Sequence, residues 1–473
     1  MATINSAFNL ISGALEADQS ALNIVANNVA NANTPGYTQQ VPNWEENGPV
    51  EINGVSYGMG VSETGATSLR DRTLEERLQQ QQQAASASTT RLAALDSVQA
   101  LFPPDSGSVS ATAGDIGSDV TGFFDSFAEL EANPTDSSSR EAVLSAARTL
   151  AADVSNAAAS LNAQRTSLDQ EAVSVTSQIN SLTSAIAKLN LQIQATSPNG
   201  DAGTLEDQRQ KDLGQLSQLV GINQITTEHN GISLTTTSGA MLVSEGTSTP
   251  LTTGTLNGGT HFFVGADDVT ASLTAGGGEL GGYLTARDQD IPQVLTALDQ
   301  FAYDIATQVN GLNNRGADLS GTTGTAASPL YIFGQPGAVA GSAAGMSVIM
   351  TDPSQISAAA AGGGSGDNAN AIALADLASK PIANGLTPSD FYSNFVTALG
   401  STVSQVQIEN TAQNASMTQL QTARDSLSGV NLNDEASFMQ QFERSYQAAS
   451  QVFAILNTVM TSALNLGVET AVS

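Results

Sequence analysis

The stretch of the chain from residue 135 to residue 197 contains neither glycine nor proline. Within it, apolar side chains recur every four and three residues, which is the period of one face of an α-helix. The pattern predicts a single helix over residues 137–195, on the order of 90 Å long at a rise of about 1.5 Å per residue. A helix of this length cannot bury its apolar stripe alone, so it requires partner helices from the same chain. The stripe consists of two runs that differ in phase near Leu168: Ala147, Leu150, Val154, Ala157 and Leu161, then Val175, Ile179, Leu182, Ile186, Leu189 and Ile193.

Both ends of the chain carry helical patterns of their own. Residues 3–30 place apolar side chains at the same spacings, and the turn-forming sequence at 31–36 ends that helix. Residues 434–466 carry two adjacent apolar rows, a face wider than one partner helix covers. We therefore predict that this last helix contacts several others, some of them from other subunits; an ordinary core helix is the alternative. The predicted subunit-interface residues are Ile4, Phe8, Ile11, Leu15, Leu22, Val25, Val29, Phe438, Phe442, Tyr446, Val452, Phe453, Leu456, Val459 and Met460.

The rest of the chain alternates between helical and β patterns. The Gln79–Gln83 run is interpreted as a solvated helix face. Extended structure is predicted at residues 37–67, and two or three β-hairpins at about residues 222–282, where alternating runs rich in Thr, Val and Ile lie between turn signals. Residues 316–368 are rich in Gly, Ala, Ser and Thr and are predicted to form a loop or a small, loosely packed module. Further helices are predicted at about residues 73–101, 120–130, 205–220, 292–312 and 388–428.

The fold class is therefore mainly α, a long helical bundle with a smaller part rich in β-hairpins in the middle.

Lys and Arg number 15 against 45 Asp and Glu, a net charge of −30, yet charged residues make up only 13% of the chain. This scarcity of cations argues against a nucleic-acid surface, which must neutralise phosphates. No Lys or Arg precedes Arg70, which argues against an N-terminal anchor to an anionic membrane. No apolar run approaches the roughly 18 residues of a membrane span.

Motifs that would indicate catalysis or ligand binding are few. The absence of cysteine excludes disulfides, thiolate catalysis and Cys-ligated metals. His229 and His261 stand apart from any acidic ligand pattern and are interpreted as polar hairpin residues. Gly276, Gly278 and Gly281 match a dinucleotide-binding fingerprint, but a predicted helix stands where the second strand is needed, so a flexible hairpin loop is predicted instead. The sequence thus predicts no catalytic, cofactor-binding or metal-binding residues and no cofactor. A conventional signal peptide is not found in residues 1–30, so we expect a cytosolic protein or one exported by another route.

Two signatures near the ends of the chain occur together with motifs in between. The first runs from Asn27 to Tyr37 and the second from Ser428 to Ala436. They resemble the terminal signatures of the flagellar axial proteins, which form the rod, the hook and the hook-associated junctions. The Ser-Gly-Val-Asn-Leu form of the second signature, with internal stretches at 207–209, 281–288 and 367–371, resembles the hook-associated family that forms the first junction between hook and filament. The motif residues are Asn27, Asn28, Asn31, Thr34, Pro35, Gly36, Tyr37, Gly429, Val430, Asn431 and Leu432.

The resemblance implies a structural protein of the bacterial flagellum and not an enzyme. Such a protein would leave the cell through the flagellar type III apparatus without a cleaved signal peptide. Several copies would form a ring between hook and filament that filament assembly requires. The implied partners are other copies of the chain, the hook protein on one side, the second junction protein on the other and an export chaperone. Neither nucleic acid nor membrane insertion is implied.

The resemblance also implies how the chain divides into domains. Residues 1–36 plus 433–473 are expected to pair as an inner terminal coiled-coil domain. Residues 37–315 plus 369–432 are expected to form a helical rod domain, with β-hairpins at about 222–282. Members of the family often carry an outer β domain in the second half of the chain. The corresponding Gly/Ala-rich segment, residues 316–368, is short here, so that outer domain is expected to be reduced or missing.

Two other functions are consistent with the same sequence. Another rod or hook protein would share the terminal signatures, although the long helix at 137–195 is not expected in one. A secreted cell-wall hydrolase, from a different class, would use paired carboxylates such as Glu45 with Glu46 or Asp267 with Asp268.

Overall fold

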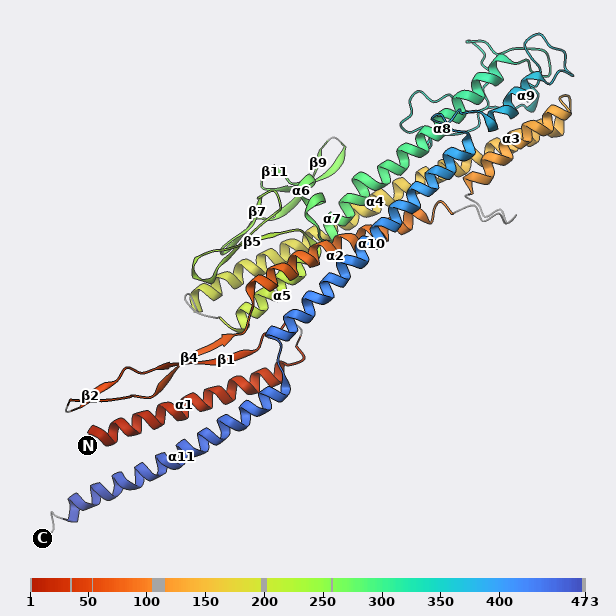
Figure 1. The fold of residues 1–473 in the computed structure, drawn as a ribbon. Helices are drawn as coiled ribbons and strands as arrows, with labels where there is room; N and C mark the ends of the chain where they lie inside the picture. The colour runs from red at the N-terminus through yellow and green to blue at the C-terminus, as the bar shows by residue number, and fades with distance from the viewer. Residues whose placement is uncertain are drawn as a thin grey trace.

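The computed structural model describes residues 2–34, 36–52, 54–103, 115–196, 202–256 and 258–469. The chain forms an elongated molecule with both termini at one end (Figure 1). Its helices are α1 (Ala2–Asn31), α2 (Arg72–Gln99), α3 (Ile116–Ala132), α4 (Ser137–Thr196), α5 (Thr204–Leu219), α6 (Thr270–Gly276), α7 (Gly278–Thr285), α8 (Ile291–Arg315), α9 (Ala369–Ala375), α10 (Pro388–Ser428) and α11 (Leu432–Glu469). Its strands are β1 (Gln40–Glu46), β2 (Val50–Ile52), β3 (Val55–Tyr57), β4 (Val61–Ser68), β5 (Asn223–Thr226), β6 (Ile232–Thr235), β7 (Met241–Ser244), β8 (Thr247–Ser248), β9 (Leu251–Leu256), β10 (Gly259–Val264) and β11 (Asp267–Asp268). The mainly α prediction is confirmed.

The strands form small antiparallel sheets beside the helices. β1 pairs with β4 and β2 with β3, which gives a long ribbon that lies next to α1 (Figure 1). β5, β6, β7 and β8 form one sheet in that order, and β9, β10 and β11 form another. Asn190 of α4 holds the first of these two sheets, because its Nδ2 donates to the Ile232 carbonyl at 2.8 Å and to the Glu245 carbonyl at 2.7 Å.

The long helix is present as predicted, and α4 extends through the rod (Figure 1). Its apolar stripe is covered by two separate hydrophobic cores. The first contains the stripe as far as Leu168 and side chains of α2, α3, α8 and α10. The second begins at Ala172 and contains side chains of α5, α6, α7 and the strands β6, β7, β9 and β10. The change of phase near Leu168 therefore marks the boundary between two packing environments along one helix.

A π-helical turn, Ala286–Asp290, joins α7 to α8 close to this boundary. Arg287 in the turn pairs with Asp169 of α4 and with Asp288, and its guanidinium lies 5.9 Å from the centre of the Phe262 ring. Asp290 in the same turn accepts two hydrogen bonds of 2.8 Å from Arg91 of α2. The turn thus directs two charged side chains to two different helices.

The prediction that the Gln79–Gln83 run forms a solvated face is wrong for Gln79 and Gln83, whereas Gln80 is exposed. Gln79 and Gln83 are buried, and the Gln83 Nε2 donates to the Ile222 carbonyl at 3.1 Å. The reason is that α2 lies between α10 on one side and α5 and α7 on the other, which leaves only part of its surface open to solvent. α2 begins at Arg72, close to the predicted start at about residue 73. Asp71 is the cap, and its carboxylate accepts the Thr73 and Leu74 amides at 3.0 Å.

The β-hairpins predicted at 222–282 end earlier than expected. The strands stop at Asp268, and residues 270–285 form α6 and α7. Of the fingerprint glycines, Gly276 and Gly278 lie at the junction of these two helices and Gly281 lies within α7, so none is in a hairpin loop. A Cβ on Gly278 would clash with the Val220 backbone, and one on Gly221 would clash with the Gly276 carbonyl. Close backbone approach therefore accounts for glycine here without a bound phosphate.

Residues 316–368 are irregular but are not loosely packed. They contain isolated β-bridges and place apolar side chains in the first core, against α8 and α3. Two buried asparagines of α8 fix the segment through its backbone: Asn310 donates to the Phe333 carbonyl at 2.9 Å, and Asn313 donates to the Leu330 carbonyl at 2.7 Å. The residues that the segment contributes to the first core are Leu330, Ile332, Phe333, Ala343, Met346, Met350, Ile356 and Ala358.

Among the residues that the structure describes, none of the helices is both long enough and apolar enough to span a bilayer.

A carboxyl pair between α3 and α4 generates a prediction about stability. Burial, together with the hydrogen bond and charge of Asp153, raises the pKa of Asp119 to about 7, above its usual value of 3.8. Between these pH values the folded chain binds a proton that the unfolded chain has lost, so stability falls as pH rises through this window. We expect Asp119→Asn to raise the melting temperature at pH 8 and to change it little at pH 4. The exposed Asp125→Asn on the same helix is the control, and equal shifts of Asp119→Asn at both pH values would contradict the assignment.

Candidate functional site

The first and last helices meet along the predicted apolar seam. α1 and α11 lie side by side at the end of the molecule opposite the loops of 316–368 (Figure 1). The rings of Phe8 and Phe453 contact edge to face with their centres 5.2 Å apart. Nearer the rod, Ala21 and Val25 of α1 pack against Phe442 of α11, with Leu22 and Met439 at the edges. Trp44 of β1 covers Phe442, with ring centres 5.8 Å apart.

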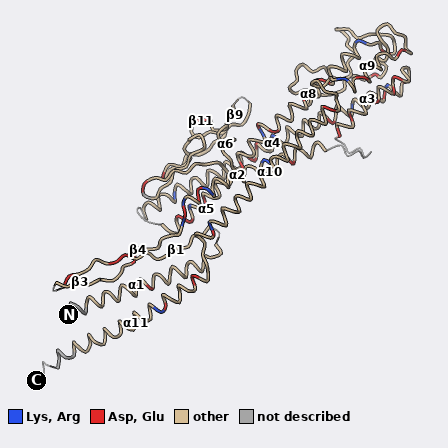
Figure 2. The backbone as a smooth tube through the Cα atoms, viewed as in Figure 1, with Lys and Arg blue, Asp and Glu red and all other residues tan. Residues whose placement is uncertain are grey.

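Much of the predicted interface remains exposed after this pairing. Charged side chains are sparse on these two helices (Figure 2), and residues 445–468 contain none. Leu22, Val25 and Phe442 lie between α1 and α11, whereas Ile11, Leu15, Leu456 and Met460 are half-buried. The side chain of Ile4 lies outside the described residues. The exposed members of the prediction are Val29, Phe438, Tyr446, Val452, Phe453 and Val459.

The structure adds two exposed apolar residues that the sequence analysis missed. Ile455 is 62% exposed and Leu464 is 60% exposed, more than any predicted interface residue of α11. Both lie off the two apolar rows that were used to predict the interface. The signal for Ile455 is its spacing of three from Val452 and four from Val459, which places the three side chains on one helix face. An apolar helix face that stays exposed to water is typical of a surface that becomes buried on assembly.

The motif residues of the two signatures are concentrated where the helix pair joins the rod. Asn28 is buried, and its amide oxygen accepts the Gln40 amide at 3.0 Å and the Tyr37 hydroxyl at 2.8 Å. Its amide nitrogen donates to the Gln40 carbonyl at 2.8 Å and to Glu435 of α11 at 3.1 Å. Asn28 therefore ties the end of α1 to the start of β1 and to α11. Burial is the main cause that raises the pKa of Tyr37 to about 12, so its hydroxyl stays protonated and donates.

Other motif residues shape the turns on either side. Asn31 donates to the Asn27 carbonyl at 3.0 Å, and Thr34 donates to the Asn31 side chain at 3.2 Å. Gly36 has φ +83°, a conformation that side-chain-bearing residues rarely adopt. In the second signature, the Asn431 side chain accepts the Asn433 amide at the start of α11. Gly429 precedes α11, and Leu432 is its first residue. Val430 is half-buried, and Pro35 lies outside the described residues.

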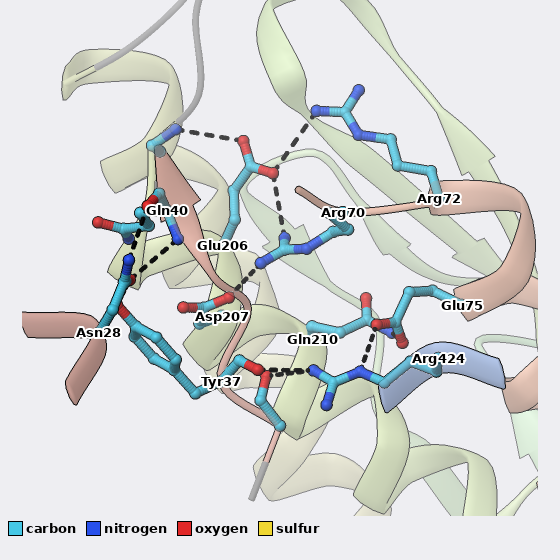
Figure 3. A network of polar contacts seen from close by, with 12 residues as sticks. Asn28, Tyr37, Gln40, Arg70, Arg72, Glu75, Glu206, Asp207, Gln210 and Arg424 are labelled. Atoms are coloured by element: carbon cyan, nitrogen blue, oxygen red, sulfur yellow. Dashed lines mark hydrogen bonds and ion pairs between the residues drawn. The ribbon is translucent and has the colours of Figure 1, made fainter. Parts of the chain in front are cut away.

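Buried ion pairs surround the same joint (Figure 3). Arg424 of α10 pairs with Glu75 of α2 at 3.2 Å and donates to the carbonyls of Gly36 and Tyr37 at 2.8 and 3.1 Å. Arg70, between β4 and α2, pairs with Glu206 of α5 at 3.2 Å and with Asp207. Of these charged residues only Asp207 lies in a motif that the sequence analysis used. The pairings themselves carried no sequence signal, because the partners are far apart in the chain.

The geometry gives no support to a catalytic or metal site. No group of three or more His, Cys, Asp or Glu side chains could hold a metal ion in the part of the chain that the structure describes. His261 pairs at 2.7 Å with Asp268 on the surface, and the His229 side chain lies outside the described residues. Glu45 and Glu46 are exposed neighbours on one strand and project to opposite faces, so they do not converge on a substrate. Asp267 and Asp268 are likewise exposed strand neighbours.

Comparisons with known proteins agree with this picture. Residues 107–327 match the family described as the helical domain of flagellar hook-associated protein FlgK, and residues 8–38 match the flagella basal body rod protein family. The chain is 28% identical to flagellar hook-associated protein 1 of Bacillus subtilis, with 96% of each chain covered. It is 24% identical to the protein of that name in Escherichia coli, with 97% of this chain and 99% of the relative covered.

A solved structure shares the fold. The flagellar hook junction protein FlgK from Burkholderia pseudomallei superposes with a TM-score of 0.65 and 19% sequence identity, over 75% of this chain and all of that chain. The helix pair, the motif residues at the joint and the long rod are the features that the resemblance to flagellar axial proteins implies. Within that class, the chain is similar to flagellar hook-associated protein 1 along almost its whole length.

The hydrogen bonds of Asn28 can be tested directly. Asn28→Ala removes the partner of the Tyr37 hydroxyl and of the Gln40 backbone, at a cost of roughly 1–3 kcal/mol for each buried polar group left unpaired. We expect the amides of α1 near Asn28 and of β1 near Gln40 to exchange hydrogen faster, while the amides of α4 stay protected. The exposed Asn23→Ala on the same helix is the control. Unchanged exchange in Asn28→Ala would contradict the structural role of the motif.

Proposed function

We propose that this protein forms the junction between the hook and the filament of the bacterial flagellum. The observation that carries the proposal is the match to hook-associated protein 1 relatives over almost the whole of both chains. The uncovered apolar face of the helix pair supports it, because a junction protein must bind to copies of itself and to its neighbours. The role is structural, and we assign no catalysis to the chain.

We further propose that several copies form a ring and that filament assembly requires this ring. The terminal unit, residues 1–36 plus 433–473, is the part that packs between copies. The rod, residues 37–315 plus 369–432, lies outside it, and residues 316–368 stand where relatives often insert an outer domain. The hook protein on one side and the second junction protein on the other are the proposed partners, together with an export chaperone. The proposed route out of the cell is the flagellar type III apparatus.

The direct test is to delete the protein in its own organism and to inspect the cells by electron microscopy. We expect hooks without filaments. Cells that lack hooks as well would favour the alternative role of a rod or hook protein, and normal filaments would reject the proposal. An assay of the purified protein for peptidoglycan hydrolysis tests the cell-wall hydrolase, for which we expect no activity.

The exposed face of α11 yields a prediction about assembly. Ile455→Asp and Val459→Asp should each prevent filament growth and leave the soluble subunit folded. Covering such a side chain in an assembly is worth about 1.5–3 kcal/mol, and a carboxylate at that position adds a desolvation cost. The loss recurs in every copy of the ring, so a modest cost per site becomes decisive.

The readout combines circular dichroism melting of the purified variants with filament counts in cells that produce only the variant. Asn457→Asp is the control, because Asn457 is exposed and polar on the same helix. A collapsed melting curve would mean that these side chains support the subunit's own core. Normal filaments would mean that this face is not buried between copies.

A further inference from the structure

The terminal part of the chain has two different flanks. α1 lies between the ribbon of β1 to β4 and the helix α11, so the ribbon forms one flank and α11 forms the other (Figure 1). A ring of identical copies is closed by head-to-tail contacts, in which two different surfaces of the chain meet. The ribbon of one copy and α11 of the next are two such surfaces, and both keep apolar side chains exposed.

The side of α11 that faces away from α1 carries a cation and an apolar row. Arg444 and Ile455 are separated by about three helical turns, and Val459 follows about one turn later, so the three side chains lie on one face. Phe442 and Phe453, which contact the ribbon and α1, lie on the opposite side of the helix. The outer face of α11, defined by Arg444, Ile455 and Val459, is therefore free to meet another molecule.

Arg444 is an exception in an acidic part of the chain. It is the only Lys or Arg of the sequence in residues 1–69 and 429–473, and the same two stretches contain several Asp and Glu. Arg444 is exposed and forms no ion pair within the residues that the structure describes. Copies of such an acidic unit repel one another when they pack side by side, and an opposite charge at the contact relieves this repulsion. The matching partner of Arg444 is thus a carboxylate of the next copy.

The ribbon offers a carboxylate at the level of Arg444. The Trp44 ring lies 5.8 Å from the Phe442 ring, which fixes the height of β1 against α11. Because successive side chains of a strand point to opposite faces, Glu45 projects away from the helix pair that Trp44 contacts. Glu45 is exposed, and Arg444 is two residues beyond Phe442. Glu45 and Arg444 therefore lie at a similar height on the two flanks.

The tip of the ribbon is apolar at the level of the apolar row of α11. Gly60 of the ribbon lies against Leu10 of α1, and Phe8, less than one turn away, contacts Phe453 of α11. Residues 50–57 extend from there toward the free end of the helix pair, where the apolar row of α11 lies (Figure 1). The exposed apolar side chains of this tip are Val50, Val55 and Tyr57.

We propose that the outer face of α11 packs on the ribbon of the next copy, with Arg444 paired to Glu45 and the apolar row against the ribbon tip. Copies in a closed ring lie at the same height, so levels that match within one copy also match between neighbours. The ion pair sets the register of the two flanks, and the burial of apolar surface stabilises the contact. The contact rests on the proposed ring and forms only between copies, so it does not require the terminal unit to be ordered in the isolated subunit.

The absence of cysteine allows this contact to be mapped by cross-linking. Cells produce two versions of the chain together, Val459→Cys and Tyr57→Cys, with tags of different size, and their isolated flagella are treated with a short bis-maleimide. Since no copy carries both cysteines, a mixed dimer forms only between copies. Asn457→Cys in place of Val459→Cys is the matched control, because Asn457 is exposed on another side of α11.

The ion pair is tested by exchanging its charges. Arg444→Glu and Glu45→Arg are produced singly and together, each as the only version of the chain in the cell. Glu46→Arg combined with Arg444→Glu is the control, because Glu46 projects from the other face of the same strand. The readout is the number of filaments per cell, with the amount of exported chain measured for each variant.

We expect the mixed dimer with Val459→Cys and little of it with Asn457→Cys. Each single charge reversal should lower the number of filaments by about tenfold, since it places like charges against each other. The exchange of both charges should restore filaments, and the Glu46→Arg combination should not. Absence of the mixed dimer in flagella that contain both versions would overturn the proposal, and so would failure of Glu45→Arg to rescue Arg444→Glu. Filaments in cells that lack the protein would reject the junction role itself, so the two failures are distinguishable.

Discussion

The burial of one long apolar stripe organises the molecule. α4 has 60 residues, and along most of this length it must be covered by other parts of the chain. The helices α2, α3, α8 and α10 cover its first half, and α5, α7 and small sheets cover the second. Helices of ordinary length cannot follow it from end to end, so the coverage changes from one set of partners to another near Leu168. The π-helical turn with Arg287 and Asp290 ties the two sets together at that level.

Periodic patterns made the helices predictable, because neighbouring residues on one helix face are only three or four positions apart in the sequence. The ends of α1, α4 and α10 lie close to the predicted positions for this reason. Contacts between distant segments were not predictable in the same way. Gln79 and Gln83 are buried only because three other helices surround α2, and the glycines at 276–281 reflect close approach to residues far away in the chain. The pairs of Arg70 and Arg424 span 136 and 349 positions, and such separations leave no periodic trace.

The terminal signatures have a physical basis in the joint. Asn28 makes four hydrogen bonds at once, and a side chain without both an amide donor and an amide acceptor would leave at least one buried partner unpaired. The apolar rows of α1 and α11 serve a different purpose, since only part of them is covered within the subunit. Family resemblance identified these residues in the sequence, and the structure separates those that hold the joint from those that remain open to other molecules.

The separation of the rod into two hydrophobic cores bears on how the protein responds to force. A chain with one continuous core tends to lose it in a single cooperative step, whereas two cores in series form two cooperative units. Here α4 is part of both units, and the boundary between the two cores lies between Leu168 and Ala172. Under a pull along the axis, we expect the more weakly packed unit to unfold before the other. The rod is therefore expected to unfold in two steps under force. The half that stays folded would then be a template on which the other half can refold.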